Sequence, residues 1–268
     1  DPVERWWRSA YLAEARNDLG YLYRTRGLFY RAVEEYRRAI EMWRRMEDEE
    51  KDAIRRMAMR AQHANVLNNL AWALAERGDL RQAESVCFDA LEMRQNLGPA
   101  APVAFSQNTL GMILIRDDKP HRARVHCERA LEIFRSLDQP RGVGLANIAL
   151  SEALRRMSEV ERLYAPEEIA NFLHQAASLA DNAVDIFKEV VPERSRLIEA
   201  LIERGCVYRF QAWLLPAYRS APDPEELKSL FQKAKGDLVK VMDLAEKDFP
   251  FRHLDAHVNL AWLLSLIH

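Results

Sequence analysis

Histidine and cysteine are the side chains of this sequence best suited to acid–base or metal chemistry, and their spacing favours neither. His121, His126 and Cys127 lie close together on one predicted helix. Cys127, however, occupies a small apolar position in a repeating pattern, and Cys87 occupies the matching position one repeat earlier. We therefore predict that both thiols are small buried hydrophobic groups and not ligands. The other histidines are scattered along predicted helices and suggest surface or capping roles.

Paired acidic residues and phosphate-binding loops are equally uninformative. Glu34-Glu35 and Glu167-Glu168 are adjacent in sequence, so their side chains point in different directions on a helix. The sequence has no glycine-rich phosphate loop, no Cys-x2-Cys and no His-Glu-x2-His. We predict no catalytic residue, no metal site and no cofactor, and therefore a protein that is not an enzyme.

Composition narrows the class of protein. Hydrophobic residues make up 49% of the 268 residues, charged residues 30%, and the net charge is -2. This is enough apolar material for a sizeable core, and the near-neutral charge argues against nucleic acid as a partner. No stretch of about 18 apolar residues occurs, so we predict no membrane helix. The 3 cysteines are odd in number and far apart, which favours a reducing, cytoplasmic location.

Arginine dominates the basic residues, since only 8 of the 39 are lysine. Two readings stay open. Base composition or a thermophilic source would explain an even spread of arginine, and we favour this reading. The alternative is carboxylate recognition, because the planar guanidinium can donate two parallel hydrogen bonds to one carboxylate.

The clearest pattern is a repeat of small and apolar residues, best seen between Asn108 and Phe134. Two helices fit this stretch, one ending near Arg116 and the next starting near Pro120. Proline is tolerated in a first helical turn, where its nitrogen needs no hydrogen bond. The pattern consists of Leu110-Gly111, Leu114, Ala123, Cys127 and Ala130. Gly111 and Ala123 lack bulk where the two helices of a hairpin must approach.

The same pattern recurs along the whole chain. The residues at the glycine position are Gly20, Ala71, Gly111, Ser151, Gly205 and Ala261, which are 51, 40, 40, 54 and 56 residues apart. We predict one all-α domain over residues 1–268, made of units at about 3–46, 47–98, 101–138, 141–190, 193–248 and a partial 251–268.

These residues resemble the tetratricopeptide repeat family, whose pattern is Trp-x2-Leu-Gly-x2-Tyr followed by Ala-x3-Phe. Leu19-Gly20, Tyr23, Ala32 and Tyr36 carry the resemblance in the first unit. The spacing exceeds the family norm of 34 residues. The long variant is similar to the repeats of kinesin light chains and of sensor arrays in bacterial signal-transduction ATPases and transcription activators. The resemblance implies a right-handed α-solenoid of about five and a half helical hairpins.

The extra length can be located in the sequence. We expect Glu47 to Arg77 to be nearly continuous and helical. In the fourth and fifth units the added residues fall between the two helices. Ala165-Pro166 and Asp223-Pro224, each followed by two glutamates, predict new helix starts.

The resemblance also implies a binding site, because the first helix of each hairpin lines the concave face of such a solenoid. Residues two positions before and after each Leu-Gly pair are expected to face inward, together with their neighbours. The candidates are Asn17, Tyr21, Arg24, Asn65, Asn68, Trp72, Asn108, Met112, Arg116, Glu152, Arg155, Arg209 and Trp262.

Each type of candidate has two interpretations. The asparagines could bind the backbone of a peptide, or could bond a neighbouring helix, and the two are evenly balanced. Tyr21, Trp72, Met112 and Trp262 could form an apolar stripe for a ligand, although packing between helices is favoured. The arginines could bind carboxylates. The Lys-Asn combination of chaperone-tail binders is absent, so that specificity is not implied.

We therefore predict a protein- or peptide-binding module. The chain begins with Asp1-Pro2 and ends in an apolar helical pattern from Leu260 to Ile267, so we expect a sensor segment of a larger cytoplasmic regulatory protein. Other domains of that polypeptide are then possible partners. The alternatives are a free-standing adaptor or scaffold and, more remotely, a helical-repeat enzyme or RNA reader.

Overall fold

The computed structural model describes residues 2–159, 164–218, 223–245 and 248–266, and in these ranges the chain is all helical. The helices are α1 Pro2–Thr25, α2 Phe29–Glu49, α3 Ala53–Arg77, α4 Leu80–Leu97, α5 Ala100–Arg116, α6 Pro120–Ser136, α7 Pro140–Ser158, α8 Pro166–Asp185, α9 Arg194–Tyr218, α10 Pro224–Ala245 and α11 Pro250–Ser265. One π-helical turn, Ile186–Val190, extends α8. The all-α helical-hairpin solenoid is confirmed.

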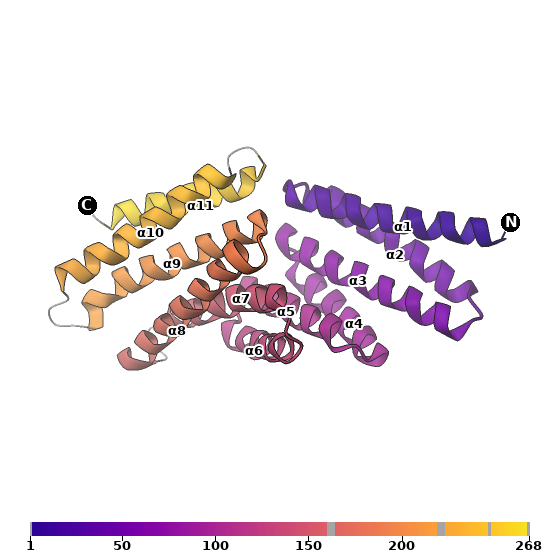
Figure 1. The fold of residues 1–268 in the computed structure, drawn as a ribbon, viewed down its shortest axis with the longest axis horizontal. Helices are drawn as coiled ribbons and strands as arrows, with labels where there is room; N and C mark the ends of the chain where they lie inside the picture. Colours follow the sequence, from indigo (N-terminus) through magenta and orange to yellow (C-terminus); the bar gives the residue numbers. More distant parts are fainter. Residues whose placement is uncertain (1, 160–163, 219–222, 246–247, 267–268) are drawn as a thin grey trace. The chain divides into compact units, whose positions relative to one another are not determined.

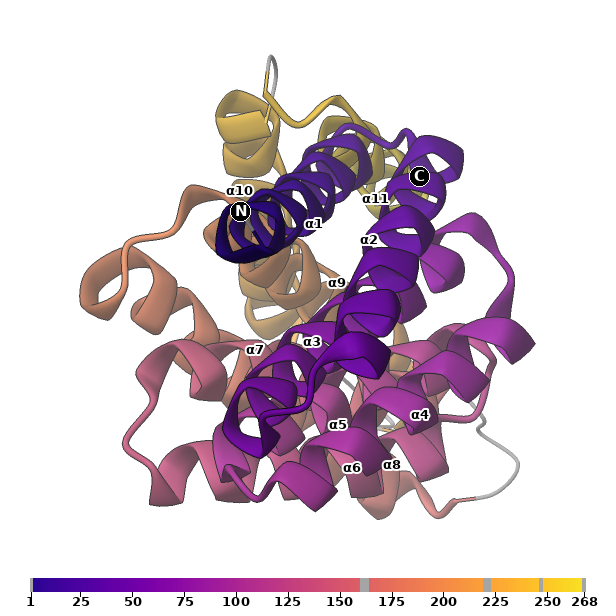
Figure 2. The same cartoon turned by 90° about the vertical axis from the view of Figure 1, so that its right-hand side faces the viewer.

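The chain divides into two compact units, Asp1–Asp118 and Lys119–His268. In the first unit α1 pairs with α2 and α3 with α4, while α5 packs on α3 and α4. Figures 1 and 2 both show α1 and α2 side by side. In the second unit α7 pairs with α8, α9 with α10, and α11 packs on both α9 and α10. The predicted apolar end of the chain runs to Ile267, which lies outside the described residues.

The stretch from Glu47 to Arg77, predicted to be nearly continuous and helical, is interrupted at residues 50–52, between α2 and α3. Helix α2 ends at Glu49, and Glu50 has an extended backbone with ψ 125°. Asp52 then caps α3, because its Oδ1 accepts a hydrogen bond from the backbone N–H of Arg55 at 2.9 Å. A side-chain acceptor at this place satisfies an N–H that has no partner inside the helix. The cap therefore separates two repeats that the apolar pattern alone joins.

The predicted helix starts in the later repeats are confirmed. Helix α8 begins at Pro166, and the Glu168 carboxylate accepts a hydrogen bond from the backbone N–H of Ala165 at 2.9 Å. Helix α10 begins at Pro224, and Asp223 accepts one from the N–H of Glu225 at 3.0 Å. Carboxylates near a helix N-terminus also interact favourably with its dipole.

Polar contacts join successive repeats of the same unit at an interval near fifty residues. Arg24 pairs with Glu76 in the first unit, and Arg141 with Glu193 in the second, each 52 residues apart. Since equivalent positions of adjacent repeats meet, this interval reflects the long period of the sequence pattern. None of the helices in the described ranges is long and apolar enough to cross a membrane.

Glycine allows two helices to approach closely at the start of α7. A Cβ added at Gly142 would lie 2.2 Å from the ring of Phe134, which is fully buried.

We expect Gly142→Ala to destabilise the protein by about 1–3 kcal/mol, since a packed core resists added volume. Gly236 is the matched control, because it lies in α10 with nothing within 4 Å of its added Cβ. Gly236→Ala should stabilise by about 0.5–1 kcal/mol. Urea unfolding of the two variants measures both effects, and equal changes would contradict the packing argument.

Candidate functional site

The first helices of the first unit bring three predicted residues together. The guanidinium of Arg24 lies 5.2 Å from the ring centroid of Tyr21 and 5.4 Å from that of Trp72. The same guanidinium donates a hydrogen bond to Glu76 at 3.2 Å, and both side chains are about nine-tenths buried. The positive charge of Arg24 is therefore already neutralised by a carboxylate of its own unit.

The predicted asparagines of α1 and α3 bond neighbouring helices. Asn17 accepts a hydrogen bond from Asn69 at 2.9 Å. Asn65 accepts one from Arg94 at 2.8 Å. Asn68 is buried, donates to Thr109 at 3.2 Å and accepts from the hydroxyl of Ser106 at 3.1 Å. These contacts favour the structural interpretation of the three amides over peptide recognition.

The predicted residues of α5 differ in exposure. Asn108 is buried, Met112 is half-buried and Arg116, at the end of the helix, is exposed. Their role in binding stays a prediction.

In the second unit, Arg155 of α7 lies at the centre of a buried ion-pair network. Its Nε and Nη2 each donate to the carboxylate of Glu203 on α9, both at 3.0 Å. Its Nη1 donates to Glu159 at 3.1 Å, and Glu152 lies within 3.7 Å of Nη2. Burial alone would lower the pKa of Arg155, but the charge of Glu203 raises it. Arg155 and Glu152, both predicted to bind a partner, are therefore engaged inside the unit.

Next to this network lies a group that we call the Arg209 cluster: Arg209, Phe210 and Trp213 of α9 with Asn259 and Trp262 of α11. The Cζ atom of Arg209 lies 3.4 Å from the ring centroid of Trp262 and 5.4 Å from that of Phe210. Its Nη1 donates to the side-chain oxygen of Asn259 at 2.6 Å. A guanidinium that stacks on a ring and donates a hydrogen bond is held in one orientation, because one face and one edge have fixed partners.

Arg209 is the least satisfied of three buried arginines. Arg94 donates to Pro102, Ser106 and Asn65, and Arg155 binds two carboxylates. Arg209 is only 4% exposed, and like Arg94 it pairs with no carboxylate within the described ranges and has an Nε without a hydrogen-bond partner. Unlike Arg94, it donates hydrogen bonds to a single described residue, Asn259. Burial lowers the pKa of Arg209 to about 10. A buried cation without a counter-ion is unfavourable, so this side chain would gain from an added anion.

Two large aromatic side chains of the Arg209 cluster remain accessible. Trp213 is 43% exposed and Trp262 is 37% exposed, with ring centroids 6.3 Å apart. Phe210 is buried beneath them, with its ring 5.7 Å from Trp213 and 5.2 Å from Trp262. Tryptophan and arginine are among the residue types most enriched at the hot spots of binding interfaces.

The sequence pattern included Arg209 and Trp262 but missed Trp213. Trp213 follows Arg209 by four residues, which places both on one face of a helix, and this spacing could have identified it. Glu203, the partner of Arg155, was also missed, although it lies 48 residues further on, close to the repeat period.

The cysteine, histidine and acidic side chains that the structure describes form no metal site. The three thiols are buried, as the repeat position predicted for Cys87 and Cys127. Burial raises the pKa of Cys206 to about 11 and that of Cys87 to about 12, so both are protonated and unreactive. Among the described residues, no group of three or more histidine, cysteine, aspartate or glutamate side chains could hold a metal ion.

Comparison with protein-family models gives one match. The tetratricopeptide repeat model matches residues 12–49 and 63–98, which include most of the first two helical hairpins. Residues 12–49 and 63–98 therefore carry tetratricopeptide repeats. The family resemblance inferred from Leu19-Gly20 and its counterparts is thus confirmed. A search of curated proteins finds none that matches the sequence.

Solved tetratricopeptide-type structures share the fold at low identity. BtubC (BKLC) from P. vanneervenii is 21% identical, with a TM-score of 0.57 over 91% of this chain and 82% of that one. A putative kinesin light chain from Podosopora anserina, with nearly identical TPR-like repeats, is 13% identical, with a TM-score of 0.53 over 87% and 97%. A Rap protein, solved in complex with competence and sporulation factor, is 13% identical, with a TM-score of 0.56 over 93% and 72%. These likenesses concern the fold.

Proposed function

We propose that the protein is a non-enzymatic recognition module that binds a protein or peptide partner through the first helices of its tetratricopeptide repeats. The Arg209 cluster carries this proposal. It combines two exposed tryptophans with a buried guanidinium that lacks a counter-ion within the described residues. A partner segment with a carboxylate beside an apolar side chain would satisfy both parts of the cluster.

The comparisons support a binding role in general terms. Tetratricopeptide repeats form solenoids with extended binding surfaces. The Rap protein of the same fold was solved with competence and sporulation factor bound. We further propose that the chain is a segment of a larger cytoplasmic regulatory protein. The alternative is that it acts as a free-standing adaptor.

Affinity capture from source cells tests the proposal. The bait would be the whole chain, compared with a Trp213→Ala, Trp262→Ala double variant. The matched control is Phe88→Ala with Val125→Ala, which removes side chains of 41% and 46% exposure from second helices. We expect the wild type and the control to retain the same partner and the tryptophan variant to lose it.

Equal capture by the tryptophan variant and the wild type, with circular dichroism showing both folded, would contradict the proposed site. Loss of the partner from the Phe88 and Val125 control alone would instead assign binding to the second helices.

A further inference from the structure

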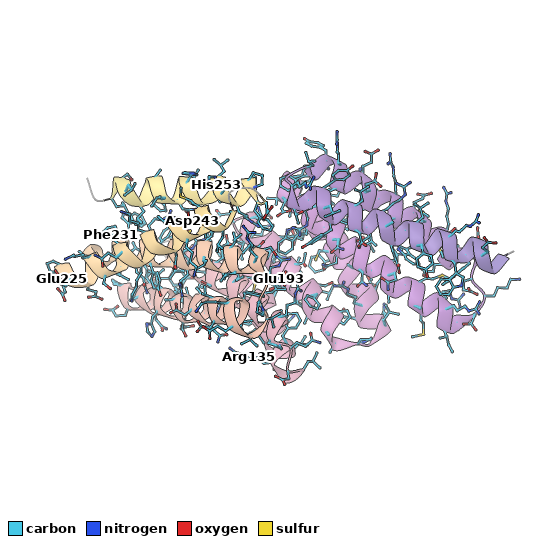
Figure 3. All side chains as sticks on the ribbon, turned by 45° about the horizontal axis from the view of Figure 1, so that its top comes forward. Arg135, Glu193, Glu225, Phe231, Asp243 and His253 are labelled. Atoms are coloured by element: carbon cyan, nitrogen blue, oxygen red, sulfur yellow. The ribbon has the colours of Figure 1, made fainter. Side chains whose placement is uncertain are left out.

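A cavity lies between α6, α7 and α8, and none of its lining residues belongs to the Arg209 cluster. Its volume is about 470 Å³, within the range of small-molecule sites. Val143 of α7 and Leu179 of α8 form part of an apolar wall, while Arg135, Asp138, Asn147 and Asn182 add polar groups. Arg135, at the end of α6, is labelled in Figure 3. The cavity belongs entirely to the second unit.

The wall of the cavity contains a buried acceptor without a donor. Asn147 is fully buried, and its Nδ2 donates to the side-chain oxygen of Asn182 at 2.6 Å. The Oδ1 of Asn147 takes no hydrogen bond from any described residue. Leaving a buried acceptor unpaired is costly, so a native protein that keeps one needs a reason.

The amide pair therefore presents two unused groups of opposite kind. Asn147 offers an oxygen that can accept, and the exposed Asn182 offers an Nδ2 that can donate. A carboxamide has both complementary groups, an N–H donor and a carbonyl acceptor. Because Asn182 is exposed, its side chain can shift to admit such a group to Asn147 while its own Nδ2 donates to the ligand.

The mouth of the cavity carries two charges of opposite sign. Arg135 and Asp138 are both exposed and line the same cavity, yet they make no ion pair with each other or with another described side chain. A free α-amino acid carries the matching carboxylate and ammonium groups. The four polar side chains thus fit the two charges and the amide of one small molecule.

We infer that this cavity binds a free α-amino acid with a carboxamide side chain. Arg135 holds the carboxylate, Asp138 holds the ammonium group, and the Asn147–Asn182 pair binds the side-chain amide. This site is independent of the partner site at Arg209.

Isothermal titration calorimetry of the whole chain tests the inference. The probes are L-glutamine and L-asparagine, with L-glutamate and L-aspartate as analogues whose side chains lack an N–H donor. We expect saturable binding of one amide and at least about tenfold weaker binding of its acid, since a site built for a donor rejects the analogue without it. Asn182→Ala and Arg135→Gln should each weaken binding at least about tenfold. Asn96→Ala, an exposed asparagine of α4 outside the cavity, should leave it unchanged.

The Asn147→Leu variant distinguishes a loss of ligand binding from a loss of stability. Asn147→Leu removes the unpaired acceptor, so its melting temperature should equal or exceed that of the wild type while binding is lost. Three results would overturn the inference. One is the absence of saturable heat with either amide at ligand concentrations up to about 10 mM, because a dissociation constant above that range would be too weak for a small-molecule site. Another is unchanged binding by Asn182→Ala. The third is equal binding of N-acetyl-L-glutamine amide, which lacks both charges and would assign the cavity to a polypeptide amide.

Discussion

Glu203→Ala is expected to destabilise the protein by about 3–5 kcal/mol, because it leaves the buried guanidinium of Arg155 without its main counter-ion. Both side chains are 7% exposed, and two hydrogen bonds of 3.0 Å join them. Ser151 also donates to Glu203 at 3.2 Å and would lose that acceptor. Urea unfolding followed by circular dichroism measures the loss. Glu189→Ala is the control, since this exposed residue pairs only with exposed Lys188 among the described side chains, and no measurable change is expected.

A double variant tests the cause of that loss. Arg155→Met with Glu203→Leu removes both charges and keeps apolar volume, so it should recover most of the stability lost in Glu203→Ala. If the double variant were as unstable as the single one, the uncompensated charge would not be the cause. If Glu203→Ala alone cost less than about 1 kcal/mol, Arg155 would have found another partner or water.

Arg209→Met is expected to lower the affinity for the partner while changing the stability of the fold little. The substitution removes a buried cation that has one amide partner and no carboxylate among the described residues, so the free energy of unfolding should change by less than about 1.5 kcal/mol. Partner affinity should fall by about 2–4 kcal/mol, roughly 30- to 1,000-fold, because a buried charge pair with the partner is lost. Arg155→Met should show the reverse pattern, with a large loss of stability.

Surface plasmon resonance with the captured partner and urea unfolding together measure these two effects. Arg24→Met is a useful second comparison, because Arg24 is also stacked between aromatic rings but is neutralised by Glu76. Arg24→Met should change the affinity for the partner little if binding depends on the unneutralised charge of Arg209. Equal losses of affinity from Arg24→Met and Arg209→Met would show that stacking, not charge, determines binding.

The fold could be predicted because its signals are local. Small residues at one position, such as Gly20, mark where two helices meet. A Cβ there would lie 2.7 Å from the ring of Tyr36. Proline at the first turn of a helix likewise marks Pro120 and Pro166 without knowledge of their neighbours. The boundary between Glu49 and Ala53 was missed, since apolar spacing continues across it and only the Asp52 cap interrupts the helix.

The candidate site could be predicted only in part, because it depends on which polar groups find partners in other repeats. Asn68 and Arg209 both lie on first helices, yet Asn68 meets Ser106 and Thr109, while Arg209 meets, among the described residues, Asn259 and two aromatic rings. The hydrogen-bonding partners lie 38 to 50 residues away. No pattern within one helix contains that information, so the Asn147–Asn182 pair was missed for the same reason.

Site-specific photo-crosslinking in source cells tests most directly whether the first-helix face binds the partner. A photoreactive amino acid would replace Trp213 in one sample and Val125, on second helix α6, in the other. The two side chains have similar exposure, 43% and 46%. The proposal predicts that the probe at position 213 crosslinks the partner and that the probe at position 125 does not. Crosslinking from position 125 alone would place the partner on the second helices and contradict recognition at the Arg209 cluster.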